Sequence, residues 1–290
     1  MNRVRLDQLL FDRGFFPSRS RAAASVLAGE VLLLPDRRRA AKPGQLVSDQ
    51  IELELVGKEP FVSRGGVKLD NALDELQVEV AGRQALDVGA SAGGFTDCLL
   101  RRGAAQVTCV DVAYGLLDYR LRSDRRVTVI ERRNARSLRP DDLPYAPDLI
   151  VVDVSFISLT KVLPAVLACA APRFDCLALV KPQFEAGRES VGKGGVVRDP
   201  AIRRRVLIDV GLAAQRLGAS VLGYASSGLP GPKGNRETFI WLAEGARGGL
   251  ADLQAAVEGV EPQRPADAAA PPGPGAQRQA REAAPPGAKP

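Results

Sequence analysis

Four charged side chains stand where they could perform acid–base chemistry together. Asp153 ends the apolar run 149–152, Lys181 ends the apolar run 177–180, Lys68 follows S-R-G-G-V, and Glu237 follows G-N-R. Open α/β sheets bind ligands outside the carboxyl ends of their parallel strands, which is where Asp153 and Lys181 would lie. Lys68 and Glu237 can reach that edge from flanking elements. Each residue alone would be interpreted as a surface salt bridge, whereas their coincidence at one edge indicates a catalytic cluster.

A run of small residues, L-D-V-G-A-S-A-G-G-F-T at 86–96, predicts a strand end, a tight turn and the start of a helix. Small residues let a ligand lie against backbone, and a helix N-terminus offers free N–H donors. The spacing differs from the G-x-G-x-x-G of dinucleotide sites, and Asp87 stands two residues before the first glycine. An anion there suits a positively charged ligand, and Asp111, after the run 107–110, suits ribose hydroxyls. Together they predict S-adenosylmethionine as the cofactor; the alternative is an ordinary strand–turn–helix whose acids only cap and are solvated.

The chain of 290 residues contains no histidine, the usual general base near neutral pH and the commonest metal ligand. Acid–base chemistry must then use Lys, Asp, Glu, Tyr or Cys. An ammonium group is a poor base at neutral pH unless a second cation or desolvation favours its neutral form. Lys68 beside Lys181, oriented by Asp153 and Glu237, would supply such a base. It would take the proton of an alcohol whose oxygen attacks a sulfonium methyl group in line. A general base of this kind raises the reaction rate about 10²–10⁴-fold.

The basic residues are concentrated at the start of the chain. The whole chain carries a net charge of +6, and residues 1–42 alone hold nine Lys or Arg against four acids. Such an excess fits a polyanionic partner, the alternative being a solvated basic face.

Composition also bounds the cellular setting. The four cysteines, Cys98, Cys109, Cys169 and Cys176, have no C-x-x-C spacing and lie among apolar residues. We expect reduced core thiols and no metal site. No run approaches the roughly 18 apolar residues of a membrane helix, and the start lacks a signal-peptide apolar region. The sequence therefore predicts a soluble, cytoplasmic protein.

Residues 1–57 favour a small α+β domain. Apolar spacing predicts one helix from Leu6 to Gly14 and a second that Ser18 caps and Gly29 ends. Strands are expected at 31–34 and 51–56. A linker is expected at 58–64.

From residue 65 to 245 short apolar runs alternate with amphipathic segments. Strands are expected at 84–88, 106–111, 126–130, 148–154, 174–180, 219–225 and 237–243, and helices at 67–77, 94–102, 158–170 and 200–217. This order predicts a Rossmann-like, seven-stranded, mostly parallel α/β sheet with helices on both faces, whose last strand is antiparallel. The loop 192–195 reads as a mobile cover, an RNA contact or a plain solvent loop. The Ala-, Pro- and Gly-rich stretch 246–290 is expected to be disordered.

The N-terminal strings R-L-D-Q-L-L, G-F-F-P-S-R-S-R-A, A-G-E-V and K-P-G resemble the S-four domain, a small RNA-binding domain named after a ribosomal protein. The resemblance covers about residues 3 to 57 and departs at L-P-D, residues 34–36. It implies that Arg5, Arg19, Arg21 and Lys42 face RNA phosphates, and Arg3 beside them completes the expected RNA-binding set. Their alternative role is ordinary surface charge.

Further strings extend the resemblance to residue 243. S-R-G-G-V-K-L, D-V-G-A-S-A-G-G-F-T, V-D-V-S-F, V-K-P-Q-F-E, G-K-G-G-V-V-R-D and G-N-R-E resemble the TlyA group of FtsJ-like ribose 2′-O-methyltransferases. The resemblance implies a Lys68–Asp153–Lys181–Glu237 tetrad with Lys181 as the base. It also implies the cofactor-binding residues: Asp87, Gly89, Ser91, Gly93, Gly94 and Phe95 for the methionine part, Asp111 for ribose and Asn134 near adenine. The implied substrate is a cytidine 2′-hydroxyl in ribosomal RNA of one or both ribosomal subunits, with no stable protein partner.

Two other functions remain open from the sequence. A non-catalytic RNA-binding ribosome-assembly factor could keep this fold, although all four tetrad residues are present. A membrane-lytic protein is the second alternative, because the family has carried a haemolysin label. The sequence offers no spanning segment and no obvious lytic helix for it.

Overall fold

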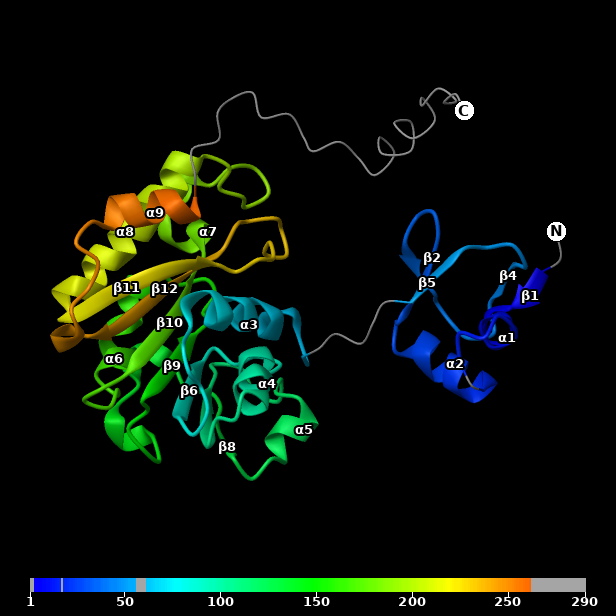
Figure 1. Cartoon of the computed structure of the whole chain (residues 1–290), viewed down its shortest axis with the longest axis horizontal. Coiled ribbons are helices and arrows are strands. Elements are labelled where there is room, and N and C mark those ends of the chain that lie inside the picture. Colours follow the sequence, from blue (N-terminus) through cyan, green and yellow to red (C-terminus); the bar gives the residue numbers. More distant parts are fainter. Residues whose placement is uncertain (1–2, 17, 56–60, 262–290) are drawn as a thin grey trace, which may run out of the picture.

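The computed structural model describes residues 3–16, 18–55 and 61–261. Two folded units are present, one up to residue 55 and a larger one from residue 61 (Figure 1). Both contain helices and strands, so the α/β class and the small α+β unit predicted from the sequence are confirmed.

The N-terminal unit joins two helices to short antiparallel strands. Its elements are β1 (Arg3–Arg5), α1 (Leu6–Asp12), α2 (Arg19–Leu27), β2 (Val31–Leu33), β3 (Arg38–Arg39), β4 (Leu46–Ser48) and β5 (Leu53–Leu55). β1 pairs with β4, while β3, β2 and β5 form a second sheet in that order. The Ser18 hydroxyl accepts the Arg21 N–H and so caps α2, as its sequence predicts. Leu6, Leu10 and Val31 are fully buried in one hydrophobic cluster that holds the unit together.

The larger unit is a seven-stranded sheet. Its strands are β6 (Gln84–Val88), β7 (Gln106–Val110), β8 (Val127–Ile130), β9 (Leu149–Val152), β10 (Asp175–Val180), β11 (Ala219–Ser226) and β12 (Thr238–Glu244). Their order is β11-β12-β10-β9-β6-β7-β8, and β12 is antiparallel to both its neighbours. The chain builds from β6 out to β8 and then returns to β9 on the other side of β6. The carboxyl ends of β6 and β9 therefore flank the topological switch point, where open α/β sheets bind ligands.

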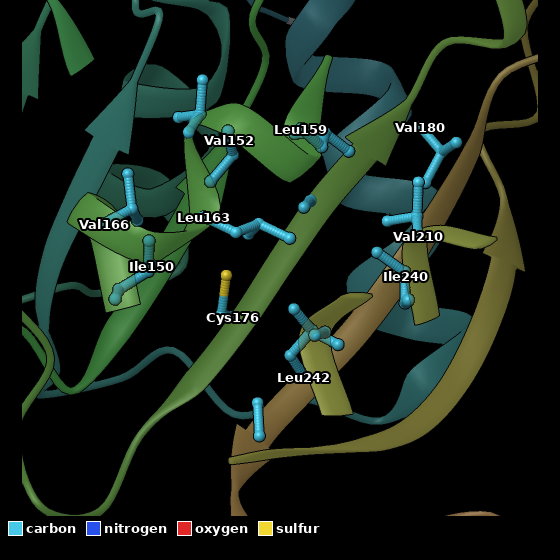
Figure 2. Packing of buried hydrophobic residues seen from close by; sticks show 14 of the residues in the cluster. Ile150, Val152, Leu159, Leu163, Val166, Cys176, Val180, Val210, Ile240 and Leu242 are labelled. Carbon is cyan, nitrogen blue, oxygen red and sulfur yellow. The ribbon is translucent and has the colours of Figure 1, made fainter. Parts of the chain in front are cut away.

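Helices cover both faces of this sheet (Figure 1). They are α3 (Arg64–Leu76), α4 (Gly94–Arg101), α5 (Tyr119–Arg122), α6 (Leu163–Leu167), α7 (Pro182–Glu185), α8 (Pro200–Arg216) and α9 (Leu253–Val260). Alternate residues of β9 serve opposite faces. Ile150 and Val152 pack with Leu163 of α6, as Figure 2 shows, whereas Leu149 and Val151 belong to the cluster of α3 and α4. A sheet covered on both sides needs apolar residues at every position, which explains the uninterrupted apolar run.

One predicted helix is shorter than expected. The segment 158–170 forms a one-turn helix, Leu159–Lys161, followed by α6. Pro164 stands in the first turn of α6. Because proline has no N–H and disfavours a helix before it, α6 begins there instead of continuing from residue 158.

The expected disordered tail is wrong for residues 253–261. Asp252 accepts the Gln254 and Ala255 N–H groups and begins α9, whose Leu253 and Val257 are buried. Residues 262–290 lie outside the described residues. So do residues 56–57 and residues 58–60 of the expected linker, whereas Phe61, also within that expected linker, is buried in the core of the larger unit. Across the described ranges, no helix is both long and apolar enough to cross a membrane.

Candidate active site

The turn between β6 and α4 accepts only glycine at its tightest contacts. Gly89 has a φ of 86°, and a Cβ on it would lie 2.4 Å from the carbonyl oxygen of Asp153. A Cβ on Gly93, which has a φ of 93°, would lie 2.3 Å from Leu121 Cδ1. The glycines therefore let the turn lie directly against the end of β9 and against the residues after β7.

Two cavities meet at this turn. The first has a volume of about 450 Å³ and is lined by Ser63, Arg64, Gly65, Lys68, Gly89, Ala90, Ser91, Ala92, Gly94, Phe95, Asp153 and Pro232. The second has a volume of about 520 Å³ and is lined by Gly89, Ser91, Val110, Asp111, Val112, Leu116, Arg133, Asn134, Ala135, Asp153, Val154, Ser155, Phe156, Ile157 and Val162. Gly89, Ser91 and Asp153 line both and form their common wall.

The four candidate catalytic residues form two lysine–carboxylate pairs at this edge. Lys68 Nζ lies 2.5 Å from Glu237 Oε2, and the side chains are only 9% and 1% exposed. Lys181 forms an ion pair with Asp153 and donates a hydrogen bond to the Ser155 hydroxyl over 2.9 Å. Lys68 and Asp153 line the first cavity together, and Asp153 and Ser155 line the second. The structure thus brings all four residues to the edge where the cavities meet, each lysine with its own counter-ion.

The second cavity holds the two residues expected at the nucleoside part of the cofactor. The Asp111 carboxylate accepts the Ser91 and Ala113 N–H groups, both over 2.7 Å. Asn134 lines the same cavity, and its side-chain oxygen accepts the Arg136 N–H over 3.0 Å. A fixed carboxylate and an amide among apolar walls suit the hydroxyls and the base of an adenosine.

Asp87 does not reach either cavity formed by the described residues. It lies inside β6, fully buried, and its Oδ2 accepts the Thr96 hydroxyl of α4 over 2.7 Å. Its Oδ1 finds no hydrogen-bond partner among the described residues. Burial raises the pKa of Asp87 to about 7, and Asp153 and Asp111 add to the shift while the Thr96 hydrogen bond opposes it. Its place differs from the expected direct contact with the cofactor, because the strand points the side chain at α4.

The N-terminal unit gathers two of the expected RNA-binding arginines on one carboxylate. Asp7 is 4% exposed, and Arg5 binds both its oxygens over 3.1 and 2.8 Å. Arg19 Nε reaches Asp7 Oδ2 over 3.2 Å. The hydrogen bonds from Arg5 hold the pKa of Asp7 below its ordinary value of 3.8, so the carboxylate stays charged and orders both guanidinium groups.

The remaining expected RNA-binding residues are Arg3, Arg21 and Lys42, and all three are exposed. Arg5 also lies against the turn that follows Lys42, because a Cβ on Gly44 would meet its guanidinium at 3.0 Å. This places Arg5 near the Lys42 turn as well as beside Arg19.

A pair of aromatic rings, one exposed and one half-buried, lies beside the second cavity and was missed from the sequence. Phe156 is 91% exposed with a φ of 63°, and its ring lies 5.2 Å from that of Phe184. The pair lines a third cavity of about 660 Å³ together with Arg136, Ile157, Ser158, Lys161, Gln183, Gly187, Arg188, Val191, Gly192 and Gly195. The motifs V-D-V-S-F and V-K-P-Q-F-E contain both rings, so the signal was their shared position just after Asp153 and Lys181.

The four cysteines are free and buried, as the sequence predicts. Burial raises the pKa of the Cys109 thiol, which removes it as a nucleophile at neutral pH. Within the described residues, no group of three or more Cys, Asp or Glu side chains is arranged to hold a metal ion.

Fold and site together define a class. A mostly parallel sheet with a reversed last strand, a glycine turn at the switch point and paired lysines and carboxylates beside a nucleoside-sized cavity describe a nucleoside-cofactor transferase. The model of the FtsJ-like methyltransferase family matches residues 61–244, and the chain belongs to that family. S-adenosylmethionine is its methyl donor.

Relatives from bacteria match over most of their length. The 16S/23S rRNA (cytidine-2′-O)-methyltransferase TlyA of Mycobacterium tuberculosis is 49% identical over 242 residues, which cover 83% of this chain and 90% of that protein. The putative rRNA methyltransferase YqxC of Bacillus subtilis is 43% identical, covering 84% and 88%. A solved structure called a putative hemolysin from Streptococcus thermophilus is 38% identical, with a TM-score of 0.68 and coverage of 89% and 96%.

Proposed function

We propose that this protein transfers a methyl group from S-adenosylmethionine to the 2′-hydroxyl of a cytidine in ribosomal RNA of one or both ribosomal subunits. The observation that carries the proposal is the pairing of Lys181 with Asp153 and of Lys68 with Glu237 at the edge where two cavities meet. The mycobacterial relative, whose name specifies cytidine 2′-O-methylation of 16S and 23S rRNA, supports the choice of acceptor.

The cofactor fits the residues present. Gly89 must lack a side chain for the turn to lie against Asp153, and the second cavity offers Asp111 to ribose hydroxyls and Asn134 to the base. Ser91, Gly94 and Phe95 in the first cavity would surround the methionine part. When bound, S-adenosylmethionine supplies an electrophilic methyl group on a sulfonium.

The lysines handle the proton of the acceptor hydroxyl. Lys181 Nζ is the base: it holds the 2′-hydroxyl and takes its proton as the oxygen becomes nucleophilic. Asp153 and Ser155 fix the direction of Lys181 Nζ. Lys68, held by Glu237, adds a second positive charge at the same edge, which stabilises the negative charge that develops on the attacking oxygen.

RNA docking belongs to the basic N-terminal unit and to the third cavity. Arg5 and Arg19 are oriented by Asp7 with about half of each side chain exposed, so their remaining N–H groups can donate to phosphates. Phe156, exposed and in contact with the half-buried Phe184, presents a ring on which an unpaired base can stack. Rings beside the Lys181–Asp153 pair suit a strand whose target ribose lies against that pair.

Incubation of purified protein with tritiated S-adenosylmethionine and isolated ribosomal subunits tests the activity. We expect wild-type protein to label at least one subunit, and Lys181→Met to reduce labelling by about 10²–10⁴-fold. Arg216→Met is the matched control. Arg216 is an exposed cation at the end of α8, at the edge of the sheet opposite Lys181, so its loss should leave labelling unchanged. Absence of label from both subunits with wild-type protein would contradict the proposal. If label appears, mass-spectrometric mapping identifies the modified nucleotide.

RNA affinity tests the docking residues separately. The double variant Arg5→Ala/Arg19→Ala should weaken binding to the labelled subunit and lower the slope of log K against log salt by roughly one for each phosphate that the arginines bind. Arg37→Ala is the matched control, since Arg37 of the same unit pairs with Glu54 instead. Equal slopes for the double variant and wild type would exclude these arginines from the interface.

A further inference from the structure

The buried carboxylate of Glu237 depends on a segment with no regular structure. Glu237 is 3% exposed and stands immediately before β12, next to the loop 227–236. Its Oε1 would lie 2.4 Å from a Cβ on Gly231, so the carboxylate rests against the backbone of that loop. The Ser227 N–H donates to the Glu237 carbonyl over 3.1 Å. Some contact must fix this loop if Glu237 is to meet Lys68.

Asn235 makes that contact. It is 2% exposed, two residues before Glu237. Its Oδ1 accepts the Val197 N–H over 2.9 Å, and its Nδ2 donates to the Gly195 carbonyl over 2.8 Å. Its own carbonyl accepts the Gly231 N–H over 2.8 Å. One side chain therefore fastens the glycine-rich loop 192–198 to the segment that carries Glu237.

A buried ion pair braces the loop from the other side. Arg203 of α8 is 7% exposed and donates from Nη1 to the Val197 carbonyl over 3.3 Å and to the Arg198 carbonyl over 2.7 Å. Its Nε and Nη2 bind the Glu261 carboxylate over 3.2 and 3.0 Å. Glu261 follows α9, is 3% exposed, and lies 3.6 Å from Arg236 Nη1. α9 lies beside α8 in Figure 1 and beyond the part of the chain that matches the methyltransferase family model.

We propose that Asn235 is a positioning residue that sets Glu237 against Lys68, and that the Arg203–Glu261 pair braces the loop on which Asn235 depends. The inference rests on the proposed function, because the tetrad is what Asn235 positions. Loss of the Asn235 side chain leaves the Val197 N–H and the Gly195 carbonyl without their partner. The position of Glu237 relative to the loop 192–198 is then no longer fixed. The cavity residues Asp111 and Asn134 are not part of this network, so the contacts to the nucleoside part of the cofactor stay intact.

Steady-state kinetics of the full-length protein test the inference. We expect Asn235→Ala to lower kcat about 30-fold while KM for S-adenosylmethionine stays within about twofold, and Glu261→Gln to lower kcat about threefold. Asn235→Asp keeps the acceptor for Val197 but loses the donor to Gly195, so its kcat should fall between wild type and Asn235→Ala. Tyr224→Phe is the matched control: it removes a buried hydrogen bond from Tyr224 to the Leu207 carbonyl, and its kcat should equal that of wild type.

Amide hydrogen exchange gives a second readout that does not need activity. In Asn235→Ala we expect faster exchange at Val197 and at Ser227, whose N–H is bonded to Glu237, but not in Tyr224→Phe. An Asn235→Ala variant with wild-type kcat, or one whose KM for S-adenosylmethionine rises as much as kcat falls, overturns the inference. If Asn235→Ala does not fold, an Asn235→Asp variant with wild-type kcat and exchange overturns it instead. If wild-type protein labels no subunit, the proposed function fails. The inference about Asn235 fails separately, if exchange at Ser227 in Asn235→Ala equals that of wild type.

Discussion

The two edges of the large sheet use the same charges in opposite ways. At the amino edge, Asp175 begins β10 and accepts Arg247 over 2.5 Å, Arg83 over 3.0 Å and the Trp241 N–H over 2.9 Å. At the carboxyl edge, Lys181 meets Asp153, and Lys68 meets Glu237, beside two cavities. One carboxylate is saturated by fixed donors, whereas the other two each face a single lysine.

The choice of cation explains the difference. Arginine stays protonated and its planar fork fills the acceptor positions of a carboxylate, so the pairs of Arg83 and Arg247 with Asp175 hold segments together. Lysine is a point charge that can give up its proton when its surroundings favour the neutral form. Under the proposed function, lysine therefore serves the edge where a proton moves, and the arginines of Asp175 serve the edge that stays fixed.

The largest effect should come from exchanging one cation at each edge. We expect Lys181→Met to lower the rate of methyl transfer by about 10²–10⁴-fold with the melting temperature within about 2 °C of wild type. Arg247→Met should do the reverse: a fall of several degrees in melting temperature and a kcat within about twofold of wild type. Scanning calorimetry and single-turnover labelling measure both. Similar losses of rate in the two variants would break the comparison.

Asp87 gives a third kind of carboxylate in the same sheet. It is buried with one hydroxyl donor, whereas Asp175 is bound by two arginines. Its pKa is raised by burial from 3.8 to about 7, so the folded state binds that proton more tightly than the unfolded chain. The stabilisation is complete below pH 3.8 and is lost as pH rises through about 7.

We therefore expect the free energy of unfolding of wild type, relative to Asp87→Asn, to fall by up to about 4 kcal/mol between about pH 4 and pH 8. Urea unfolding at several pH values measures it. Asn keeps the acceptor for the Thr96 hydroxyl but does not titrate. Parallel pH profiles for the two proteins would show that Asp87 does not carry the shift.

Removing the charge of Asp175 should mainly cost stability. Asp175→Asn leaves Arg83 and Arg247 without their shared carboxylate, at a cost of about 3 kcal/mol in the free energy of unfolding. The kcat of the folded protein should stay within about twofold of wild type, measured well below the melting temperature. A large fall in kcat would mean that the amino edge takes part in catalysis.

The smallest effect concerns the cofactor. Asp111→Asn should raise the dissociation constant for S-adenosylmethionine about tenfold, or about 1.4 kcal/mol, without changing the melting temperature of the free protein. Asp118→Asn is the control, because Asp118 caps α5 and binds Arg120 without lining the second cavity among the described residues. Titration calorimetry measures both dissociation constants. Equal affinities of the two variants for S-adenosylmethionine would exclude Asp111 from the ribose site.

Much of the fold was predictable because the strands are buried on both faces. Runs such as 149–152 are apolar at every position and stand out without any knowledge of their partners. α9 was missed although its signal was present: Leu253, Ala256, Val257 and Val260 lie at helical spacing after the capping Asp252. The Ala-, Pro- and Gly-rich composition around it concealed a helix that packs on α8.

The candidate site was predictable in its members but not in its pairs. Strand ends place Asp153 and Lys181 at one edge from sequence alone. The contact between Lys68 and Glu237 joins residues 169 positions apart and depends on how α3 packs on the sheet. The direction of Asp87 was within reach, because in β6 it alternates with Leu86 and Val88, which face the other layer. The charge of Asp87 suggested a contact with the cofactor at the turn, whereas its position in the strand indicates a side chain buried under α4.

The wall shared by the two cavities bears on inhibition and resistance. Gly89, Ser91 and Asp153 separate the nucleoside cavity from the cavity that holds Lys68. Under the proposed function, a single analogue of S-adenosylmethionine would occupy both cavities across this wall. Enlarging residue 89 would block such a compound, but the added Cβ would collide with the Asp153 carbonyl. Such a substitution would thus displace the end of β9, which carries Asp153, as well as the compound.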